Sequence, residues 1–318
     1  MAGNLLSLAA DQTLWFAWWR FVTGVGAGGL ISITFTVMGL TRNSDRNFGY
    51  LIMGVLTFGA LGLWVMPAVL EAVGVRGLII GFALYGLSGW WCLSRLPDSG
   101  QEHLQVNADA VDMGVDMRCF AILAMFTYFL AQGVIWAYLF LIGTNAGMTE
   151  QAVANGLMLS QFLGIAGALV AAMAGDRYGR ILPLAVGVLG GALVLAAVLD
   201  AFSALVYVVT VCVYNFAWNL SHPFLLAAMA SFDRHGRVVV YAVAAQMLGL
   251  AVGPALAATL LAGGDYNRVV WAGIGLFVLS YFMILVPLLS HRRQRNASLR
   301  GAATDPAPAE VSRPRRPA

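Results

Sequence analysis

Lysine is absent from this 318-residue sequence, so all 18 of its basic residues are arginines. Charged residues of both signs make up only 10% of the chain, whereas a soluble domain usually carries about 25%. Because 60% of the residues are hydrophobic, these few charges cannot cover a water-facing surface. The composition therefore excludes an ordinary soluble domain and indicates a protein whose natural solvent is lipid.

The sequence also lacks the patterns that indicate an enzyme, a metal site or a disulfide framework. It contains no P-loop, no HExxH and no GxSxG motif, which are patterns tied to particular chemistries. Its three cysteines, Cys92, Cys119 and Cys212, form no CxxC pair, and an odd number argues against a disulfide framework. We therefore expect no enzymatic activity, no cofactor and no metal, and interpret the cysteines as small packing residues.

Long apolar runs make up most of the chain. A helix that spans the hydrocarbon of a bilayer needs about 20 mostly apolar residues. This length predicts an all-α polytopic membrane protein with about nine transmembrane helices. Residues 1–9 read like the end of another apolar helix, which suggests a natural chain that begins further upstream. The nine runs are 14–40, 49–71, 75–94, 119–143, 151–174, 181–200, 203–230, 237–262 and 268–289.

The polar segments divide the chain into parts. Residues 95–118 are acidic and without helical apolar periodicity, so they predict a linker between a front part of three helices, 1–94, and a back part of six helices, 119–290. Residues 291–318 are rich in Arg, Pro and Ala, and this composition predicts a disordered basic tail.

The arginines are distributed unevenly between alternate loops. All of them except Arg20, Arg76 and Arg268 lie in the linker, in the tail or in the loops 41–48, 175–180 and 231–237. The positive-inside rule makes these segments cytoplasmic. We therefore expect a multi-pass protein of the cell inner membrane, with its N-terminus outside and its C-terminus in the cytoplasm.

Two stretches of the chain look alike. Asp45-Arg46 precedes an apolar helix that ends in LGLWVMP at Pro67, and Asp233-Arg234 precedes one that ends in LGLAVGP at Pro254. Repeats with the same orientation suggest two halves related by an axis along the membrane normal. The alternative is a coincidence between two helices rich in Leu and Gly.

The glycines after Arg20 allow two interpretations. Gly24-x-Gly26-x-x-Gly29 imitates a dinucleotide-binding fingerprint, but that fingerprint requires a strand, a tight turn and a helix. These glycines lie inside one apolar run, which excludes it. In a helix, Arg20, Gly24 and Gly28 share one stripe, where the glycines would permit close helix packing.

Three motifs together resemble those of the major facilitator superfamily of transporters. The stretch from Arg20 to Gly28 resembles its fourth-helix motif, and GDRYGR, which ends at Arg180, resembles its loop motif between helices eight and nine. Gly249-x-x-x-Gly253-Pro254 resembles its glycine-proline helix motif. The resemblance implies that the chain corresponds to helices four to twelve of a twelve-helix fold, so that residues 1–94 are the remnant of an N-terminal bundle.

The sequence departs from the family pattern at two positions. Ala172 stands where the loop motif usually has a glycine, and Met66 stands where the front glycine-proline motif would have one. The resemblance nevertheless implies that the charged turns form a conformational latch on the cytoplasmic face, with an ordinary charged turn as the alternative. The latch residues would be Asp45, Arg46, Asp176, Arg177, Gly179, Arg180, Asp233 and Arg234.

Polar residues within the apolar runs are candidates for a solute or proton path, since such groups are costly in lipid. His222 lies about 12 Å from the cytoplasmic end of its run, and Pro223 frees the carbonyl of Asn219. The alternatives are a packed histidine and, for Arg20, snorkelling to the outer interface. The candidates are Arg20, Gln132, Trp136, Gln161, Asn215, Asn219, His222 and Gln246.

The resemblance implies a secondary active transporter that moves a small organic solute by alternating access. Proton coupling would fall to a carboxylate in the missing N-terminal helices or to His222, because Glu71, Asp200 and Asp265 lie at outer helix ends. The alternative is a truncated or non-transporting scaffold or sensor derived from a transporter. The expected partners are a small-molecule solute, protons and the lipid bilayer, with no nucleic acid, for a chain that acts as a monomer.

Overall fold

The computed structural model describes residues 1–9, 13–39, 41, 43–93, 110–175, 177–200, 202–261 and 264–304. Regular structure in these residues is entirely helical. Eight helical stretches are long and apolar enough to cross a membrane, and six of them belong to the back part. The prediction of an all-α polytopic membrane protein is confirmed for the part of the chain that the structure describes.

The front part consists of α1 (Ala2–Leu8), α2 (Thr13–Gly39) and α3 (Ser44–Leu93). Helix α3 covers the predicted run 49–71 and residues 75–93 of the predicted run 75–94, and it changes direction between them at Gly74 (φ 64°, ψ −177°). Only glycine adopts such a conformation at no steric cost, so the break falls where the sequence permits it. The backbone of 62–68 is helical, but the side chains of the repeat motif there lie outside the described residues.

The back part follows the predicted runs with local interruptions. The run 119–143 begins earlier than expected and splits into two helices, and the run 181–200 contains a π-helical turn at Ala185–Leu189. The elements are α4 (Val115–Trp136), α5 (Leu139–Asn145), α6 (Glu150–Ala174), α7 (Ile181–Leu184), η1 (Ala185–Leu189), α8 (Gly190–Leu195), η2 (Ala196–Val198), α9 (Ala204–Ser231), α10 (Arg237–Leu260) and α11 (Tyr266–Thr304).

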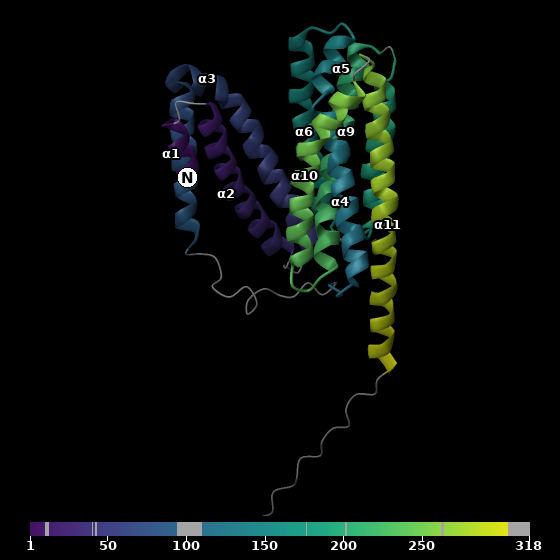
Figure 1. Ribbon diagram of the computed structural model, residues 1–318. Coiled ribbons are helices and arrows are strands. Elements are labelled where there is room, and N and C mark those ends of the chain that lie inside the picture. Colours follow the sequence, from purple (N-terminus) through teal and green to yellow (C-terminus); the bar gives the residue numbers. More distant parts are fainter. Residues whose placement is uncertain are drawn as a thin grey trace, which may run out of the picture.

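The prediction of a disordered tail from residue 291 is wrong over its first part, because α11 continues to Thr304. No proline interrupts the chain between Pro287 and Pro306, and the residues between them are compatible with a helix. The first turn beyond Pro287 also packs against the rest of the bundle, since Leu288 and His291 are buried. The helix is visible in Figure 1 as the long yellow element that extends past the others.

Glycines allow α10 to pack closely on α4. A Cβ added at Gly253 would lie 2.6 Å from the backbone of Gly133, and one added at Gly249 would lie 2.7 Å from the carbonyl oxygen of Phe126. Gly249 and Gly253, for which the sequence predicts a packing role, thus lie where the two helix backbones approach most closely. By contrast, added Cβ atoms at Gly24 and Gly28 would meet nothing within 4 Å among the described residues, so the close packing expected there is not seen.

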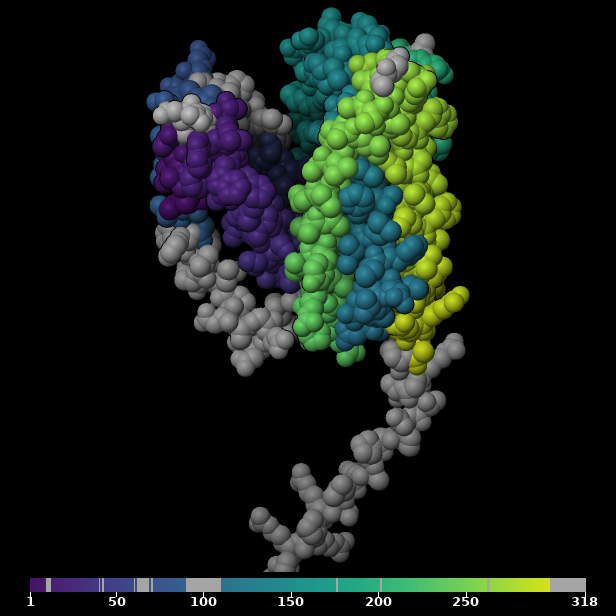
Figure 2. Space-filling model, in the orientation of Figure 1, coloured from purple at the N-terminus to yellow at the C-terminus, as the bar shows by residue number. Residues whose placement is uncertain are grey.

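The front and back parts meet at one end and separate toward the other (Figure 1). At the shared end, Gly39 lies against Ala230, and Gly49 lies against Ala172. The space-filling view shows the opening that separates α2 from the back bundle at the opposite end (Figure 2). Two helix groups that are joined at one end therefore enclose a cleft that is open at the other.

The arginine-rich loops gather at the joined end. Val111 N–H donates to the carbonyl of Ser231 at 3.0 Å, which brings the end of the linker against the loop 231–237. Arg180 contacts Asp45, which brings together the loops 175–180 and 41–48. The predicted alternation, in which these loops share one side, is consistent with this arrangement.

Candidate functional site

A bidentate ion pair joins the two parts at their shared end. The Arg180 guanidinium donates from Nε and an Nη atom to the two carboxylate oxygens of Asp45, at 3.0 and 2.9 Å. Both side chains are largely buried, with 11% and 7% of their surface exposed. Asp45 also lies in the first turn of α3, where the helix dipole favours a carboxylate. Paired hydrogen bonds of this kind are strong and specify orientation.

The other predicted latch residues near this pair have local roles. Arg46 donates to the hydroxyl of Tyr50, at 3.0 and 3.1 Å, on the same helix. Gly179 has φ +64°, so the tight turn expected of this glycine is present. Arg177 is exposed, and Asp176 lies outside the described residues. Among the described residues of this group, only Asp45 and Arg180 form a contact between the front part and the back part.

The related turn at Asp233 is organised differently. Its carboxylate accepts the backbone N–H of His235 and, at 3.0 Å, that of Arg237. It therefore caps α10, whose N-cap residue, Gly236, has no side chain. Arg234 donates from Nε to the carbonyl of Ala110 at 3.3 Å and so holds the end of the linker. This second copy of the charged turn thus stabilises the back part from within.

The same turn contains the potential metal ligands Asp112, Asp233 and His235, whose ligand atoms lie within 4.8 Å of one another. Asp112 is also 3.6 Å from the guanidinium of Arg118 and accepts the backbone N–H of Arg234. Both oxygens of Asp233 already accept backbone hydrogen bonds. Hydrogen bonds and ion pairs account for this cluster, so the prediction of no metal stays in place.

His222 lies where α2, α4, α9 and α10 converge. Its Nε2 is 3.2 Å from the side-chain oxygen of Gln246. Its ring packs edge-on against Phe129 of α4, with a centroid separation of 5.0 Å, and against Phe35 of α2, at 6.4 Å. Phe35 in turn contacts Phe48 of α3. His222 and Gln246, which the sequence singled out separately, therefore form one group at the contact between the two parts.

The sequence did not single out the phenylalanines of this contact. Phe35, Phe48 and Phe129 occur in apolar runs that contain many other aromatic residues. Their importance comes from helix packing over long sequence distances, for which a single sequence carries no signal.

Gln132 belongs to a hydrogen-bonded network inside the back bundle. Its amide nitrogen donates to the hydroxyl of Tyr128 at 3.1 Å, and its oxygen accepts from the hydroxyl of Tyr214. The Tyr128 hydroxyl also lies 2.7 Å from that of Ser221. These partners satisfy the amide and link α4 to α9. The sequence missed both tyrosines and Ser221, which carry the same network.

The asparagines of α9 bond mainly to one another and to α6. Asn215 donates to the hydroxyl of Ser160 at 3.0 Å, and Asn219 donates to the side-chain oxygen of Asn215 at 2.6 Å. A glycine, Gly164, gives these side chains room, because an added Cβ would lie 2.8 Å from the amide of Asn219. The half-buried Gln161 has no hydrogen-bond partner among the described residues.

Trp136 and Trp218 form an aromatic pair further from the shared end. Their rings meet edge-on with a centroid separation of 5.6 Å. Trp218 lies one turn from His222 on α9, on the same helix face. Its indole Nε1 is buried and lacks a hydrogen-bond partner in the described part of the chain. A buried donor without an acceptor is costly, which makes this indole N–H a candidate donor in the site.

Arg20 does not join these residues. Its guanidinium donates to the side-chain oxygen of Asn4 at 2.7 Å and so ties α2 to α1. It precedes Phe35 by about 22 Å of helix. The path candidates therefore separate into His222 with Gln246, the tryptophan pair, two internal amide networks and a distant arginine.

These features define a class: an all-α multi-pass membrane protein made of two helix groups that are joined at one end. Neither the models of known protein families nor the curated proteins include a match to this sequence.

Proposed function

We propose that this protein is a secondary active transporter of the cell inner membrane, which moves a small organic solute by alternating access. The observation that carries the proposal is the pair of helix groups, in contact at the arginine-rich end and separated by a cleft at the other (Figures 1 and 2). With arginines in the cytoplasm, this is an arrangement open to the outside. The resemblance of the motifs to the major facilitator superfamily supports the same proposal.

The inner closure would consist of two layers. The Asp45–Arg180 pair closes the cytoplasmic rim. The ring of His222, packed between Phe35 and Phe129, forms the second layer, on the outer side of this pair. Opening toward the cytoplasm requires that both contacts separate while the outer ends approach. A solute that binds this second state more tightly than the first drives the exchange between them.

The solute site in this proposal lies beside Trp136 and Trp218, on the outer side of His222. The unpaired indole N–H of Trp218 would donate to an acceptor on the solute, and the two rings would contact an apolar or aromatic part of it. The proton would be carried by His222. Its Nε2–H donates to the side-chain oxygen of Gln246, so the imidazole would take up the proton at Nδ1 and keep this hydrogen bond.

A non-transporting scaffold is the second candidate, and one observation favours it. The amides of Gln132, Asn215 and Asn219 all bond to neighbouring side chains, as they would in a permanently packed bundle. The two candidates differ in whether the inner closure opens, which can be measured before the solute is known.

The test places a single cysteine at Trp136 in a chain whose three natural cysteines are replaced by serine. Vesicles of both orientations are treated with a membrane-impermeant maleimide. We expect labelling from the outside only, with labelling from the inside gained when Asp45→Asn is added. Arg46→Gln is the matched control and should gain none. A scaffold would give the same pattern for all variants, and that result would refute alternating access.

A further inference from the structure

The tryptophan pair of the proposed solute site belongs to a larger aromatic wall. The ring of Trp218 lies 5.6 Å from that of Trp136 on α4 and 6.4 Å from that of Tyr214 on α9, between ring centroids. Phe277 of α11 extends the wall, since its ring lies 6.1 Å from that of Tyr214. Both tryptophans are only half-buried, so part of each ring remains accessible to a solute.

One polar atom in this wall has no partner. The indole Nε1 of Trp218 is buried and donates to none of the residues that the structure describes. Trp218 also lines a crevice with Tyr214 and with Gly187 of η1, and this crevice is too narrow to admit a water molecule. An indole N–H can only donate, and a buried donor that makes no hydrogen bond is costly. A solute with an acceptor therefore gains affinity at Trp218 that a solute without one does not.

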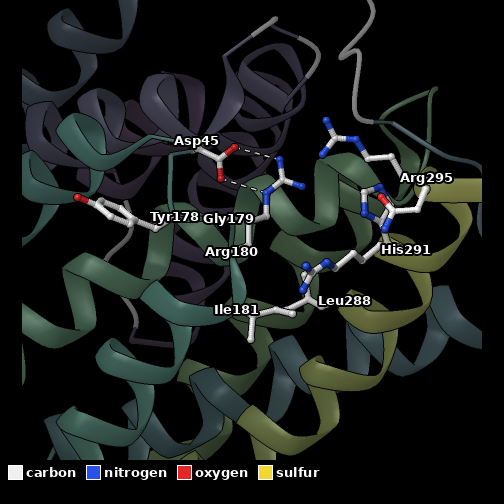
Figure 3. Close-up of a pocket in the computed structure, with 10 residues that line it drawn as sticks. Asp45, Tyr178, Gly179, Arg180, Ile181, Leu288, His291 and Arg295 are labelled. Carbon is white, nitrogen blue, oxygen red and sulfur yellow. Dashed lines mark hydrogen bonds and ion pairs between the residues drawn. The ribbon is translucent and has the colours of Figure 1, made fainter. Parts of the chain in front are cut away.

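No acidic or basic residue lies along the helices that hold these rings. Asp, Glu, Lys and Arg are all absent from 119–149, 201–232 and 269–290, which cover the apolar lengths of α4, α9 and α11. The ion pair of Asp45 and Arg180 lies at the joined end of the molecule, where the two side chains bind each other (Figure 3). A charged group that leaves water for a site without a counter-charge loses much of its hydration energy. The wall therefore favours a solute without net charge.

His222 is the one histidine in these ranges. Its ring contacts Phe35 and Phe129, and its Nε2–H donates to Gln246, so none of these contacts is with the tryptophan pair. Arg20 of the front part precedes Phe35 by about 22 Å of helix and is therefore distant from this group. The proton and the solute would occupy separate sites, and an uncharged solute needs no counter-charge from the histidine.

We propose that the solute of this site is an uncharged aromatic compound that carries a hydrogen-bond acceptor, such as a carbonyl oxygen. The acceptor takes the hydrogen bond of the Trp218 N–H, and the aromatic part packs against the rings of Trp136 and Trp218. Rotation of the half-buried Trp218 side chain brings its N–H from the crevice to the solute. This inference rests on the solute site proposed above, and it names the class of compound that the site takes.

The experiment measures the binding of phenyl compounds to the purified full chain by sealed equilibrium dialysis. Both compartments contain the same non-ionic detergent, so that partition into micelles cancels. Acetophenone carries the acceptor, ethylbenzene lacks it, benzoate is an anion and phenyltrimethylammonium is a cation. We expect acetophenone to bind at least about tenfold more tightly than either charged compound, because the site offers no counter-charge.

The variant Trp218→Phe tests the indole N–H, because it keeps an aromatic ring and removes the donor. Acetophenone should bind this variant about threefold to tenfold more weakly than it binds the parent, as expected for one lost hydrogen bond. The affinity for ethylbenzene should change less than twofold. Trp271→Phe is the matched control, since Trp271 is exposed on α11, and it should leave both affinities unchanged.

The comparison of compounds on the parent chain needs no variant, so it decides the proposal even if Trp218→Phe fails to fold by circular dichroism. Tighter binding of benzoate or phenyltrimethylammonium would overturn the uncharged class. An equal loss of acetophenone and ethylbenzene in a folded Trp218→Phe chain, or no loss of either, would overturn the role of the N–H.

The maleimide experiment on the inner closure separates this inference from the transport proposal. Preference for acetophenone without opening of the inner closure would support the solute class in a protein that binds without transport. Opening of the closure without that preference would keep alternating access and refute the solute class.

Discussion

At the scale of single residues, the Asp45–Arg180 pair makes the clearest prediction. Replacement of Asp45 by Asn leaves the largely buried guanidinium of Arg180 beside a neutral amide. Breaking a buried pair typically costs about 3–5 kcal/mol, and the residual exposure places this loss at about 2–3 kcal/mol. Thermal unfolding in detergent should show a lower midpoint than the parent. Arg46→Gln, on the same turn, should leave the midpoint unchanged, and an equal fall in both variants would contradict the role of the pair.

Gln132 allows a second residue-scale prediction. Substitution by Leu removes the acceptor of the Tyr214 hydroxyl and the donor to Tyr128, inside the back bundle. A buried polar group left without a partner costs about 1–3 kcal/mol. We expect chemical unfolding to report a destabilisation of this size. Gln161→Leu, which removes no hydrogen bond among the described residues, is the control, and a similar loss there would show that the network is unimportant.

At the scale of helices, the contact between α4 and α10 depends on paired glycines. A side chain at Gly253 would meet the backbone of Gly133 at 2.6 Å, and backbone cannot move aside as a side chain can. Gly253→Val should therefore destabilise the fold by at least about 1–3 kcal/mol, measured by the unfolding midpoint. Gly24→Ala faces open space and should change stability by less than about 1 kcal/mol. Similar effects of the two substitutions would refute the close approach.

Another prediction at this scale concerns the end of α11. If residues 291–304 are helical, their amides should exchange with deuterium more slowly than those of an unstructured chain. Mass spectrometry of peptides from this segment measures the exchange. The substitution Gln294→Pro should remove the protection beyond that residue, because proline disrupts a helix interior. If these amides in the parent chain exchange at the rate of an unstructured chain, the segment is disordered, as its composition predicts.

The elements also show how far the sequence could predict this molecule. The apolar runs, the break near Gly74 and the shared end of the arginine-rich loops follow from lipid, glycine geometry and charge, which act locally. The helix from residue 291 onward was missed because composition suggested disorder, although the burial of His291 holds its start against the bundle. The site was predicted only in part, because the meeting of Phe35 with His222 depends on contacts between distant segments.

At the scale of the whole molecule, the proposed transport mechanism requires that the open end can close. Spin labels attached to cysteines at Glu71 on the front part and Asn145 on the back part, both exposed, report the separation of the outer ends by electron paramagnetic resonance. The parent should populate mainly a long separation. Asp45→Asn weakens the inner contact and should add a population at shorter separation, as expected when an equilibrium between two states shifts.

A disulfide at the inner end provides the matching control. A Cβ added at Gly39 would lie 2.9 Å from the Cβ of Ala230, so the two helices must separate slightly to reach the roughly 3.5–4.5 Å that a disulfide spans. Gly39→Cys and Ala230→Cys are introduced together in the Asp45→Asn background. When their disulfide is formed, the population at shorter separation should vanish, and a reductant should restore it. The spin labels are attached through thioether bonds, which a reductant does not cleave, before the pair is oxidised and while the cysteines of Gly39→Cys and Ala230→Cys are protected. A short population that persists in the cross-linked chain would mean that the outer ends move independently of the inner closure, which alternating access does not allow.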